Sequence, residues 1–473
     1  MANPYDEIAY PTTAFRQTHP DRLATHAALF GLPFAPAAAC RVLDIGCGDG
    51  ANLIPMAVAY PTSRFVGFDL SERAVERGRD VIAALRLPNI RLEARDLAEA
   101  DYGAGGFDYV IAHGLYSWIP AAARDALMAS VRRHLAPDGV AFVSHNALPG
   151  GHAQRMIREM LLFHLRGIEG PAARLQGATR HLRQMVETYS ADAPFERLAK
   201  SECLDLLARP PEVLAHDQLG EVFEPVHLHE FLDHAARHGL QFLTEAGPTR
   251  CGEGFRPPYA LDDPTFDVLA HAQELDFDVL RSYRQNLLVH AAVALDRRPE
   301  PTRLRGLYAA TPAKATEPGV YEVGTLQFQL SDAALQGVIE RLSAAWPAAL
   351  PVAELADDEE RLGALLRMYW SGALDLHSAA APFSIEVGER PCASPLARLQ
   401  AARGERRLVT LRHAEIEIGD DAGLAFIAGL DGQRSVARIA ADVAAELGAP
   451  AQQIEPAVRA KLHDLARLGL LLL

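Results

Sequence analysis

Short apolar runs alternate with longer amphipathic segments over the first third of the chain. The runs at 42–45 and 65–68 are bounded by polar and glycine residues, as expected for short strands buried on both faces. Apolar residues then recur at helical spacing, most clearly over 72–85. Because strands alternate with helices, the pattern predicts parallel βαβ units. Three further runs are predicted strands, at 90–94, 107–112 and 140–144.

The same sheet is expected to continue much later in the chain. A helix precedes a strand-like run at 240–245, and 283–290 is the predicted seventh, antiparallel strand. The polar segment 171–225 has apolar residues at i, i+3 and i+4, so we expect a helical insert between the fifth and sixth strands. The alternative is a separate middle domain over about 166–300.

A third region with a weak internal repeat follows residue 300. The segments 351–376 and 435–472 each predict helix, turn, helix and strand, which is the order of a winged helix. From Arg390 onward the chain carries 11 Lys or Arg and 10 Asp or Glu. A basic recognition helix is therefore not indicated, and contact with protein is favoured over contact with DNA.

The turn after the first strand carries the most specific chemistry. It has the sequence Asp-Ile-Gly-Cys-Gly-Asp-Gly, beginning at Asp44. Glycines at such a turn let the backbone approach a ligand closely and enter a helix. The second strand is followed by Asp69, about 20 residues beyond the turn, where an acid can hold a ribose diol. Together these features predict a nucleoside-binding unit.

The acid at position 44 distinguishes between nucleoside ligands. Gly46, Gly48 and Ala51 loosely fit the dinucleotide spacing, which brings a pyrophosphate onto a helix N-terminus. A carboxylate at Asp44 would repel a pyrophosphate but can pair with an ammonium group. S-adenosylmethionine carries an ammonium and no phosphate, and Asp96 after the third strand can accept a hydrogen bond from adenine. S-adenosylmethionine is therefore the favoured ligand. The alternatives are a dehydrogenase, which would bind a dinucleotide, and a nucleotide-binding module that catalyses no reaction.

The expected cofactor contacts cluster around the glycine turn and the strand ends. Cys47 is expected to be a small residue beside the cofactor, because nothing near it in the sequence would activate its thiol. The aromatic segment before position 18 is either a lid over the cofactor or plain packing; it contains Tyr5, Tyr10, Pro11 and Phe15. The expected cofactor-binding residues are Asp44, Gly46, Cys47, Gly48, Asn52, Asp69, Leu70, Asp96, Leu97 and His113.

Motifs at 41–53, 111–120, 226–231 and 393–400 carry a family resemblance. Together they resemble the class I S-adenosylmethionine-dependent methyltransferases with a methyltransferase regulatory domain, a group that includes rickettsial lysine methyltransferases of outer-membrane proteins. The resemblance extends from about Tyr10 to the C-terminus. It implies an α/β fold: a Rossmann-like class I methyltransferase core with a seven-stranded sheet, a helical middle insert and an α+β, winged-helix-like C-terminal domain.

Three domains are expected on this basis. Residues 1–165 form the S-adenosylmethionine-binding core with its N-terminal arm, and 166–300 form a middle regulatory domain with the insert and the last sheet strands. Residues 301–473 form the winged-helix-like domain, which contacts a substrate or partner.

The resemblance further implies methyl transfer to lysine amines of a protein. The reference pKa of a lysine amine is about 10.4, so the site must lower that pKa by desolvation or accept the proton. His113 follows the fourth strand, at the sheet edge where the methyl group should lie, and is the candidate proton acceptor. Tyr116 and Trp118 are candidates for holding the ammonium by cation–π contact. The alternatives are a cofactor contact or packing for His113 and core packing for Trp118.

Two other functions remain open from the sequence. One is a methyltransferase acting on the nitrogen or oxygen of a small molecule such as a natural product or a sugar. The other is a cofactor-binding scaffold without catalysis. The large part of the chain outside the core favours a macromolecular substrate.

Charge and cysteine content indicate which classes of partner and which cellular location to expect. The formal net charge of −15 disfavours nucleic acid and favours basic substrates. The five cysteines form no Cys-x-x-Cys pair, so reduced thiols and a cytoplasmic location are expected. The N-terminus is polar, and no apolar run approaches the ~20 residues of a membrane span. Membrane insertion is therefore not expected, and a homodimer is left open.

Four histidines invite a metal hypothesis: His227, His229, His234 and His238. The last two lie one helical turn apart. However, the sequence between them contains no zincin-type acid. The sequence therefore predicts an ordinary helix surface and no metal.

Overall fold

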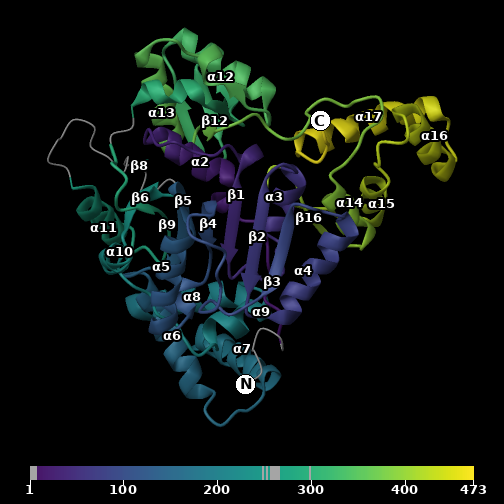
Figure 1. Ribbon diagram of the computed structural model, residues 1–473. Helices are drawn as coiled ribbons and strands as arrows, with labels where there is room; N and C mark the ends of the chain where they lie inside the picture. Colours follow the sequence, from purple (N-terminus) through teal and green to yellow (C-terminus); the bar gives the residue numbers. More distant parts are fainter. Residues whose placement is uncertain (1–7, 248–249, 252–253, 256–266, 298–299) are drawn as a thin grey trace.

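The computed structural model describes residues 8–247, 250–251, 254–255, 267–297 and 300–473; the expected lid residue Tyr5 lies outside these ranges. Its centre is a seven-stranded sheet with the order β3-β2-β1-β4-β5-β9-β6 (Figure 1). All strands are parallel except β9, which pairs antiparallel with both β5 and β6. The strands are β1 (Arg41–Ile45), β2 (Arg64–Asp69), β3 (Ile90–Ala94), β4 (Phe107–Ala112), β5 (Leu135–Asn146), β6 (Leu240–Glu245) and β9 (Tyr283–His290).

The seven-stranded sheet and its antiparallel last strand confirm the predicted fold. The fifth strand differs from the prediction, because it begins at Leu135 rather than at 140. Leu135 is buried and pairs with Phe107, and a register shift follows between Phe107 and Tyr109. This irregularity conceals the start of the strand from pattern analysis.

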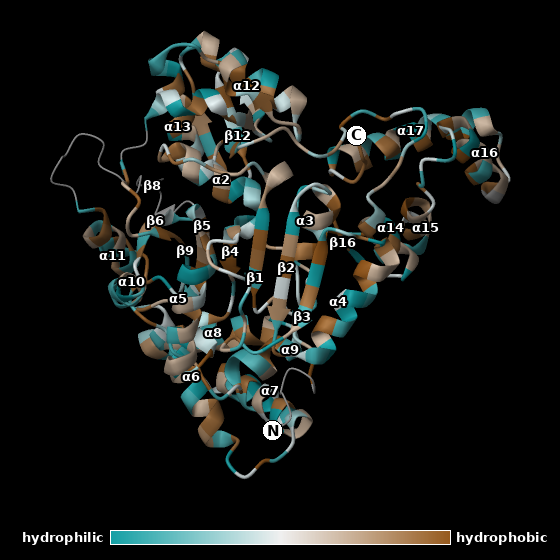
Figure 2. Cartoon of the chain, viewed as in Figure 1, coloured by the Kyte–Doolittle hydropathy of each residue, from teal (hydrophilic) through white to brown (hydrophobic). Residues whose placement is uncertain are grey.

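Helices cover both faces of the sheet. Neighbouring strand residues point to opposite faces, so that Val42 belongs to one hydrophobic cluster and Leu43 to another. The strands are largely hydrophobic, whereas α4 alternates between hydrophobic and hydrophilic positions (Figure 2). The first face packs against α2 (Pro20–Leu29), α3 (Leu53–Ala59) and α4 (Glu72–Leu85). The second packs against α5 (Ala121–His134), α10 (Leu228–Arg237) and α11 (Val268–Asp278).

A helical insert separates β5 from β6, as predicted. Its helices enclose a hydrophobic cluster of their own, which contains Leu161, Leu182 and Cys203. The insert ends in a π-helical turn, η4 (Leu214–Gln218). Its other helices are α6 (Gly151–His164), α7 (Pro171–Thr188), α8 (Pro194–Ala208) and α9 (Pro211–Val213).

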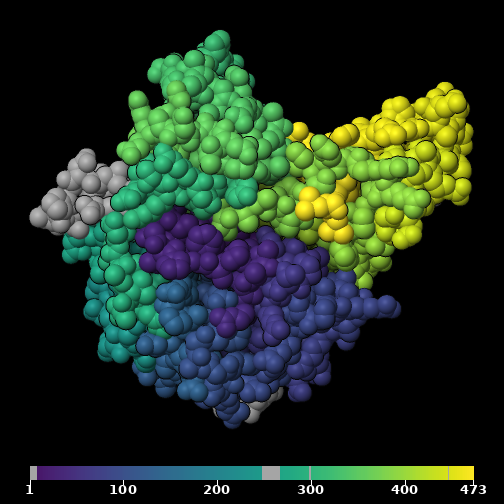
Figure 3. Space-filling model, turned by 45° about the horizontal axis from the view of Figure 1, so that its top comes forward, coloured from purple at the N-terminus to yellow at the C-terminus, as the bar shows by residue number. Residues whose placement is uncertain are grey.

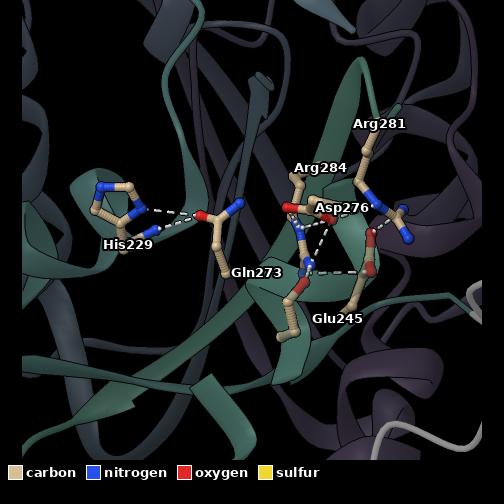
Figure 4. A network of polar contacts seen from close by, with 7 residues as sticks. His229, Glu245, Gln273, Asp276, Arg281 and Arg284 are labelled. Atoms are coloured by element: carbon tan, nitrogen blue, oxygen red, sulfur yellow. Dashed lines mark hydrogen bonds and ion pairs between the residues drawn. The ribbon is translucent and has the colours of Figure 1, made fainter. Parts of the chain in front are cut away.

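Buried ion pairs fasten the last strands of the sheet to α11 (Figure 4). Arg284 of β9 contacts Asp276 of α11 at 2.7 Å and Glu245 of β6 at 3.4 Å. The Asp276 side chain is fully buried, and that of Arg284 is 2% exposed. Arg281 adds a second ion pair with Glu245 at 3.0 Å. One network therefore joins three elements of the sheet's far edge.

The residues after 300 contribute to two hydrophobic clusters. Those up to about 376 share a cluster with α2, which Leu396 and Val409 also join, and the other buried hydrophobic residues from 393 onward form a second cluster. The first group contains η5 (Pro301–Gly306), β10 (Tyr308–Ala310), β11 (Lys314–Glu317), β12 (Val320–Val323), β13 (Leu326–Gln329), α12 (Ala333–Ala345), β14 (Leu350–Pro351), η6 (Val352–Glu354), α13 (Glu359–Ser371) and β15 (Asp375–His377). The second contains α14 (Pro395–Ala402), β16 (Arg407–Val409), β17 (Glu415–Glu417), α15 (Asp421–Ala428), α16 (Val436–Leu447) and α17 (Ala451–Arg467).

The structure differs from the predicted internal repeat in two details. In the first copy, the expected leading helix is only the short 3-10 turn η6 before α13. In the second copy, α16 and α17 are full helices, and the expected strand is reduced to a bridge between Leu471 and Ala393. The domain divisions at 165/166 and 300/301 remain predictions. Within the described ranges, we find no helix that combines the length and apolarity needed to cross a membrane.

Candidate active site

The turn between β1 and α3 forms an open backbone surface. Gly46, Gly48 and Gly50 all have positive φ angles, of 77°, 57° and 75°. A Cβ atom on Gly48 would lie 3.0 Å from Thr12, and one on Gly50 would lie 2.8 Å from Leu92. Gly46 is exposed. The turn therefore needs glycine and leaves its backbone open to a ligand, as the predicted cofactor requires.

Asp69 is held rigidly at the end of β2. Its two carboxylate oxygens accept hydrogen bonds from the backbone N–H groups of Gly48, at 2.9 Å, and Ser71, at 2.8 Å. Burial raises the pKa of this carboxyl group, and the two backbone hydrogen bonds act in the opposite direction. The acid expected to bind a ribose diol therefore lies directly against the glycine turn.

The residues expected near adenine follow at the same edge. Ala94 of β3 pairs with Asp69, so Asp96 comes just beyond the strand end. Asp96 is exposed, and one of its oxygens accepts from the backbone of Ala98 at 2.8 Å. Leu70 is 65% exposed, and Leu97 is half-buried. An exposed leucine beside two acids is a suitable surface for a planar base.

Asp44 is a buried carboxylate suited to a cationic ligand. It is 3% exposed, and Asn52 donates a hydrogen bond to it at 3.4 Å. Burial raises its pKa to about 7, the Asn52 hydrogen bond lowers it, and the charge of Asp69 raises it. A buried carboxylate is costly unless it is paired. The ammonium of S-adenosylmethionine would supply that pairing, so the residues fit this cofactor.

Asn52 connects Asp44 to two distant parts of the chain. Its side-chain oxygen accepts from the backbone N–H of Phe15 at 3.0 Å and lies 2.9 Å from Nε2 of His413. Because the Phe15 N–H can only donate, the amide orientation is determined, and His413 must donate from Nε2. The Asn52 nitrogen then donates to Asp44 and to Thr18.

The N-terminal segment lies against the glycine turn. Thr12 donates to Asp49 in the turn at 2.6 Å, and the ring of Phe15 lies 3.8 Å from that of His113. His216 of η4 bonds the carbonyl of Ile8 at 2.7 Å. Figure 3 shows the N-terminal segment, in purple, between the sheet-bearing part of the molecule and the later residues. This placement favours the lid hypothesis over packing alone.

His113 follows β4 and faces two hydroxyl groups. Its Nδ1 lies 3.3 Å from the hydroxyl oxygens of both Ser144 and Tyr283. Burial lowers the pKa of His113 to about 4, so the imidazole is neutral at pH 7. A group with this pKa is a weak base, which suits orienting an amine better than removing its proton.

An acidic side chain extends this cluster. Asp217 of η4 accepts a hydrogen bond from Tyr10, and burial raises the pKa of Asp217 to about 6. Burial, together with the Asp217 charge, raises the pKa of Tyr283 to about 12. The N-terminal segment and β9 therefore contribute side chains next to His113, and Asp217 of the insert acts on Tyr283.

Tyr116 and Trp118 are occupied by contacts within the protein. Tyr116 is 3% exposed, its hydroxyl lies 2.8 Å from Nδ1 of His234, and the Arg124 guanidinium lies over its ring. Trp118 packs on Phe223, with ring centroids 5.0 Å apart. These contacts favour packing, and the catalytic roles expected for Tyr116 and Trp118 stay predictions.

Sequence reasoning missed several residues of this site. Ser144 ends the predicted fifth strand and Tyr283 starts the predicted antiparallel one, so the topology places both at the edge where His113 lies. His413 left no comparable signal, because 361 residues separate it from Asn52.

Comparisons with known proteins match three separate segments of the chain. Residues 42–139 match a "Methyltransferase domain", 210–290 a "Predicted methyltransferase regulatory domain" and 389–469 a "PKMT, C-terminal winged helix domain". An uncharacterised protein of Rickettsia prowazekii is 33% identical over 240 residues, which cover 50% of this chain and 96% of that protein. A second one from the same organism is 33% identical over 298 residues, 62% of this chain and 54% of that protein. The chain thus spans about half the length of this second relative.

Solved structures show the same fold over nearly the whole chain. The structure of PKMT2 from Rickettsia typhi is 23% identical, with a TM-score of 0.85, and the match covers 98% of this chain and 100% of that one. The same protein in complex with AdoHcy has a TM-score of 0.83 at 23% identity, covering 98% and 99%. The cofactor is S-adenosyl-L-methionine. The chain belongs to the class I S-adenosylmethionine-dependent methyltransferases that carry a methyltransferase regulatory domain and a PKMT-type C-terminal winged helix.

Proposed function

We propose that this chain methylates lysine side-chain amines of a protein substrate. The observation that carries the proposal is the match of residues 389–469 to the winged helix of the PKMT family, whose abbreviation stands for protein-lysine methyltransferase. The nearly balanced charge of this region suits a protein surface better than DNA. The excess of acidic residues over the whole chain favours a basic acceptor.

The cofactor would be held at the glycine turn. Asp44, supported by Asn52, faces the position for the ammonium, and Asp69 that for the ribose. Asp96, Leu70 and Leu97 lie where adenine is expected. When bound, S-adenosylmethionine supplies a methyl group that is already activated on a sulfonium.

The protein must then position and desolvate the acceptor amine. Phe15, His113 and Tyr283 form an aromatic surface beside the turn, and burial there lowers the pKa of an amine. The carboxylate of Asp217 attracts the arriving ammonium, and the neutral imidazole of His113 orients the amine. In this arrangement His113 is the candidate catalytic residue.

A small-molecule acceptor is the second candidate. Trans-aconitate 2-methyltransferase from Deinococcus radiodurans is 31% identical over 112 residues, but these cover only 24% of this chain. A match to so small a part of the chain favours a common cofactor more than a common substrate.

Tritiated S-adenosylmethionine distinguishes the candidates. The full chain is incubated with labelled cofactor and a lysate of the source organism, and products are resolved on a gel. We expect a labelled protein band whose modified residue is lysine by mass spectrometry. The Asp69→Ala variant, which should lose cofactor affinity, is the negative control. Label confined to the small-molecule fraction would overturn the proposal in favour of the second candidate.

A further inference from the structure

Three metal-binding side chains meet where two helices pack together. Helices α5 and α10 lie side by side (Figure 1). Asp125 of α5 places Oδ1 3.4 Å from Nε2 of His234, on α10, and 2.9 Å from Nε2 of His238, the residue that caps the C-terminus of α10. The three ligand atoms lie within 4.8 Å of one another. The sequence argument against a metal was that the histidine pair lacks the acid of a zincin motif, and the fold supplies a carboxylate from 109 residues away.

The spacing of the ligand atoms suits a small divalent cation. Zinc binds imidazole nitrogen and carboxylate oxygen at about 2.0–2.2 Å in tetrahedral sites, which places neighbouring ligand atoms about 3.3 Å apart. The two oxygen-to-nitrogen distances, 2.9 and 3.4 Å, lie on either side of this value. Two histidines four residues apart on a helix present their rings on one face. Little movement is therefore needed to bring all three ligands onto one ion.

A second layer of contacts orients the buried ligand. Nδ1 of His234 lies 2.8 Å from the hydroxyl of Tyr116, which can accept a hydrogen bond from it. A metal on Nε2 of His234 requires the tautomer with the proton on Nδ1, which then donates to Tyr116; without a metal, Nε2 can carry the proton and donate to Asp125. Histidine ligands of metals commonly have such an outer partner, which fixes the tautomer and the ring orientation.

The site is open on one side. The side chain of His234 is 9% exposed, that of His238 is 16% exposed and that of Asp125 is 67% exposed. The exposed carboxylate leaves a path by which an ion can enter. It also leaves room for water to complete the coordination beside the three protein ligands.

We propose that Asp125, His234 and His238 form a binding site for a divalent transition metal, with Zn²⁺ the best match. Asp125 lies in the segment that matches the methyltransferase domain, and both histidines lie in the segment that matches the regulatory domain. A bound ion therefore fastens these two segments to each other. Through His234 and Tyr116, the site also connects to the loop after β4, which begins at His113.

Metal titration of the tag-free, metal-free full chain tests the site. We expect one Zn²⁺ per chain by calorimetry, and the spectrum of four-coordinate Co²⁺ when cobalt replaces zinc. His238→Ala and Asp125→Asn should each weaken Zn²⁺ affinity by about tenfold or more. His463→Ala, at an exposed position on α17, is the matched control and should leave the affinity unchanged.

Two further measurements distinguish a built site from adventitious binding at exposed histidines, which are His152, His164, His229 and His463. Tyr116→Phe keeps the ring but removes the outer partner, so it should weaken Zn²⁺ binding by about tenfold without changing the stoichiometry. Zn²⁺ should raise the melting temperature of the wild type and not that of His238→Ala. Equal Zn²⁺ affinity in wild type and His238→Ala, or no stoichiometric binding, would overturn the proposal. Because the readout is metal binding, the result is independent of the methyl acceptor.

Discussion

At the scale of single residues, two carboxylates beside the glycine turn, the buried Asp44 and the half-buried Asp69, are predicted to divide the recognition of the cofactor. Asp69 is satisfied by two backbone donors, so it is rigid and oriented before a ligand arrives. Asp44 has one long hydrogen bond, from Asn52, and sits in an environment that disfavours its charge. We therefore expect the first acid to contribute geometry and the second an electrostatic preference for a cation.

Replacing Asp69 with alanine should weaken cofactor binding. The substitution leaves the ribose hydroxyls without an acceptor, which costs about 1–3 kcal/mol. Calorimetric titration with S-adenosylhomocysteine measures the loss as a higher Kd. Asp80→Ala, at an exposed position on α4, is the control. An unchanged Kd for Asp69→Ala would mean that the ribose lies elsewhere.

Cofactor affinity should also depend on pH through Asp44. The ammonium pairs with the ionised carboxylate, and burial raises the pKa of Asp44 to about 7. Below that pH the carboxyl group is protonated, so affinity should rise as pH increases through about 7 and level off above it. Titrations across this range in wild type and Asp44→Asn provide the measurement. The variant should bind weakly with a flatter profile, and parallel profiles would assign the pH dependence to another group.

The sequence identified these acids because each lies next to a strand end, within one βαβ unit. It did not identify the partners that come from far along the chain. Asn52 was expected to contact the cofactor, but its bond to His413 could not be anticipated. The same limit explains why Asp125 was not associated with His234 and His238. Local patterns determine which residues end strands, whereas such pairs depend on the tertiary packing.

At the scale of elements, the prediction was accurate where a regular residue pattern marks the strand. The predicted strands at 90–94 and 107–112 coincide with β3, an edge strand that alternates apolar and polar residues, and with β4, a largely buried apolar run. Where other contacts decide the boundary, the pattern was less informative, as at Leu135 and at the short turn η6. The far edge of the sheet depends on polar contacts that no periodicity reveals, namely the ion pairs around Arg284.

Removing one member of that network should destabilise the fold. Asp276→Ala leaves the buried Arg284 guanidinium without its main partner, and breaking a buried pair in this way costs about 3–5 kcal/mol. Thermal unfolding followed by circular dichroism should show a lower midpoint. Asp101→Ala is the control, because its ion pair with Arg133 is as short, at 2.6 Å, but exposed. Equal shifts in the two variants would contradict a special role for burial.

At the scale of the whole molecule, the N-terminal segment connects three parts of the chain. Arg16 and Arg22 both pair with Asp375 of β15, at 2.8 and 2.9 Å. One step earlier in the chain, Phe15 touches both His113 and Asn52. The segment therefore links Asn52 beside the glycine turn, His113 after β4 and Asp375 in the residues after 300. Its aromatic composition suggested a lid, but the ion pairs to Asp375 could be found only in the structure.

The region matched to the winged helix also contacts the glycine turn, through the hydrogen bond of His413 to Asn52. This residue lies in the turn between β16 and β17, has a φ angle of 56° and is 3% exposed. A histidine in the left-handed region is uncommon, and its side chain here donates to Asn52, which in turn donates to Asp44. The C-terminal region thus supports the carboxylate that is predicted to pair with the cofactor ammonium.

Substitutions at His413 can separate this support from general stability. Glycine removes the donor and accepts a positive φ without strain, whereas asparagine also tolerates this conformation and keeps a side-chain donor. We expect His413→Gly to weaken S-adenosylhomocysteine binding several-fold, with His413→Asn closer to wild type, while the melting temperatures of the two variants remain similar. A loss of the Asn52 contact leaves Asp44 less well oriented, so the effect should disappear in the Asp44→Asn background. Additive losses in the double variant would show that the winged helix acts on the cofactor site by another route.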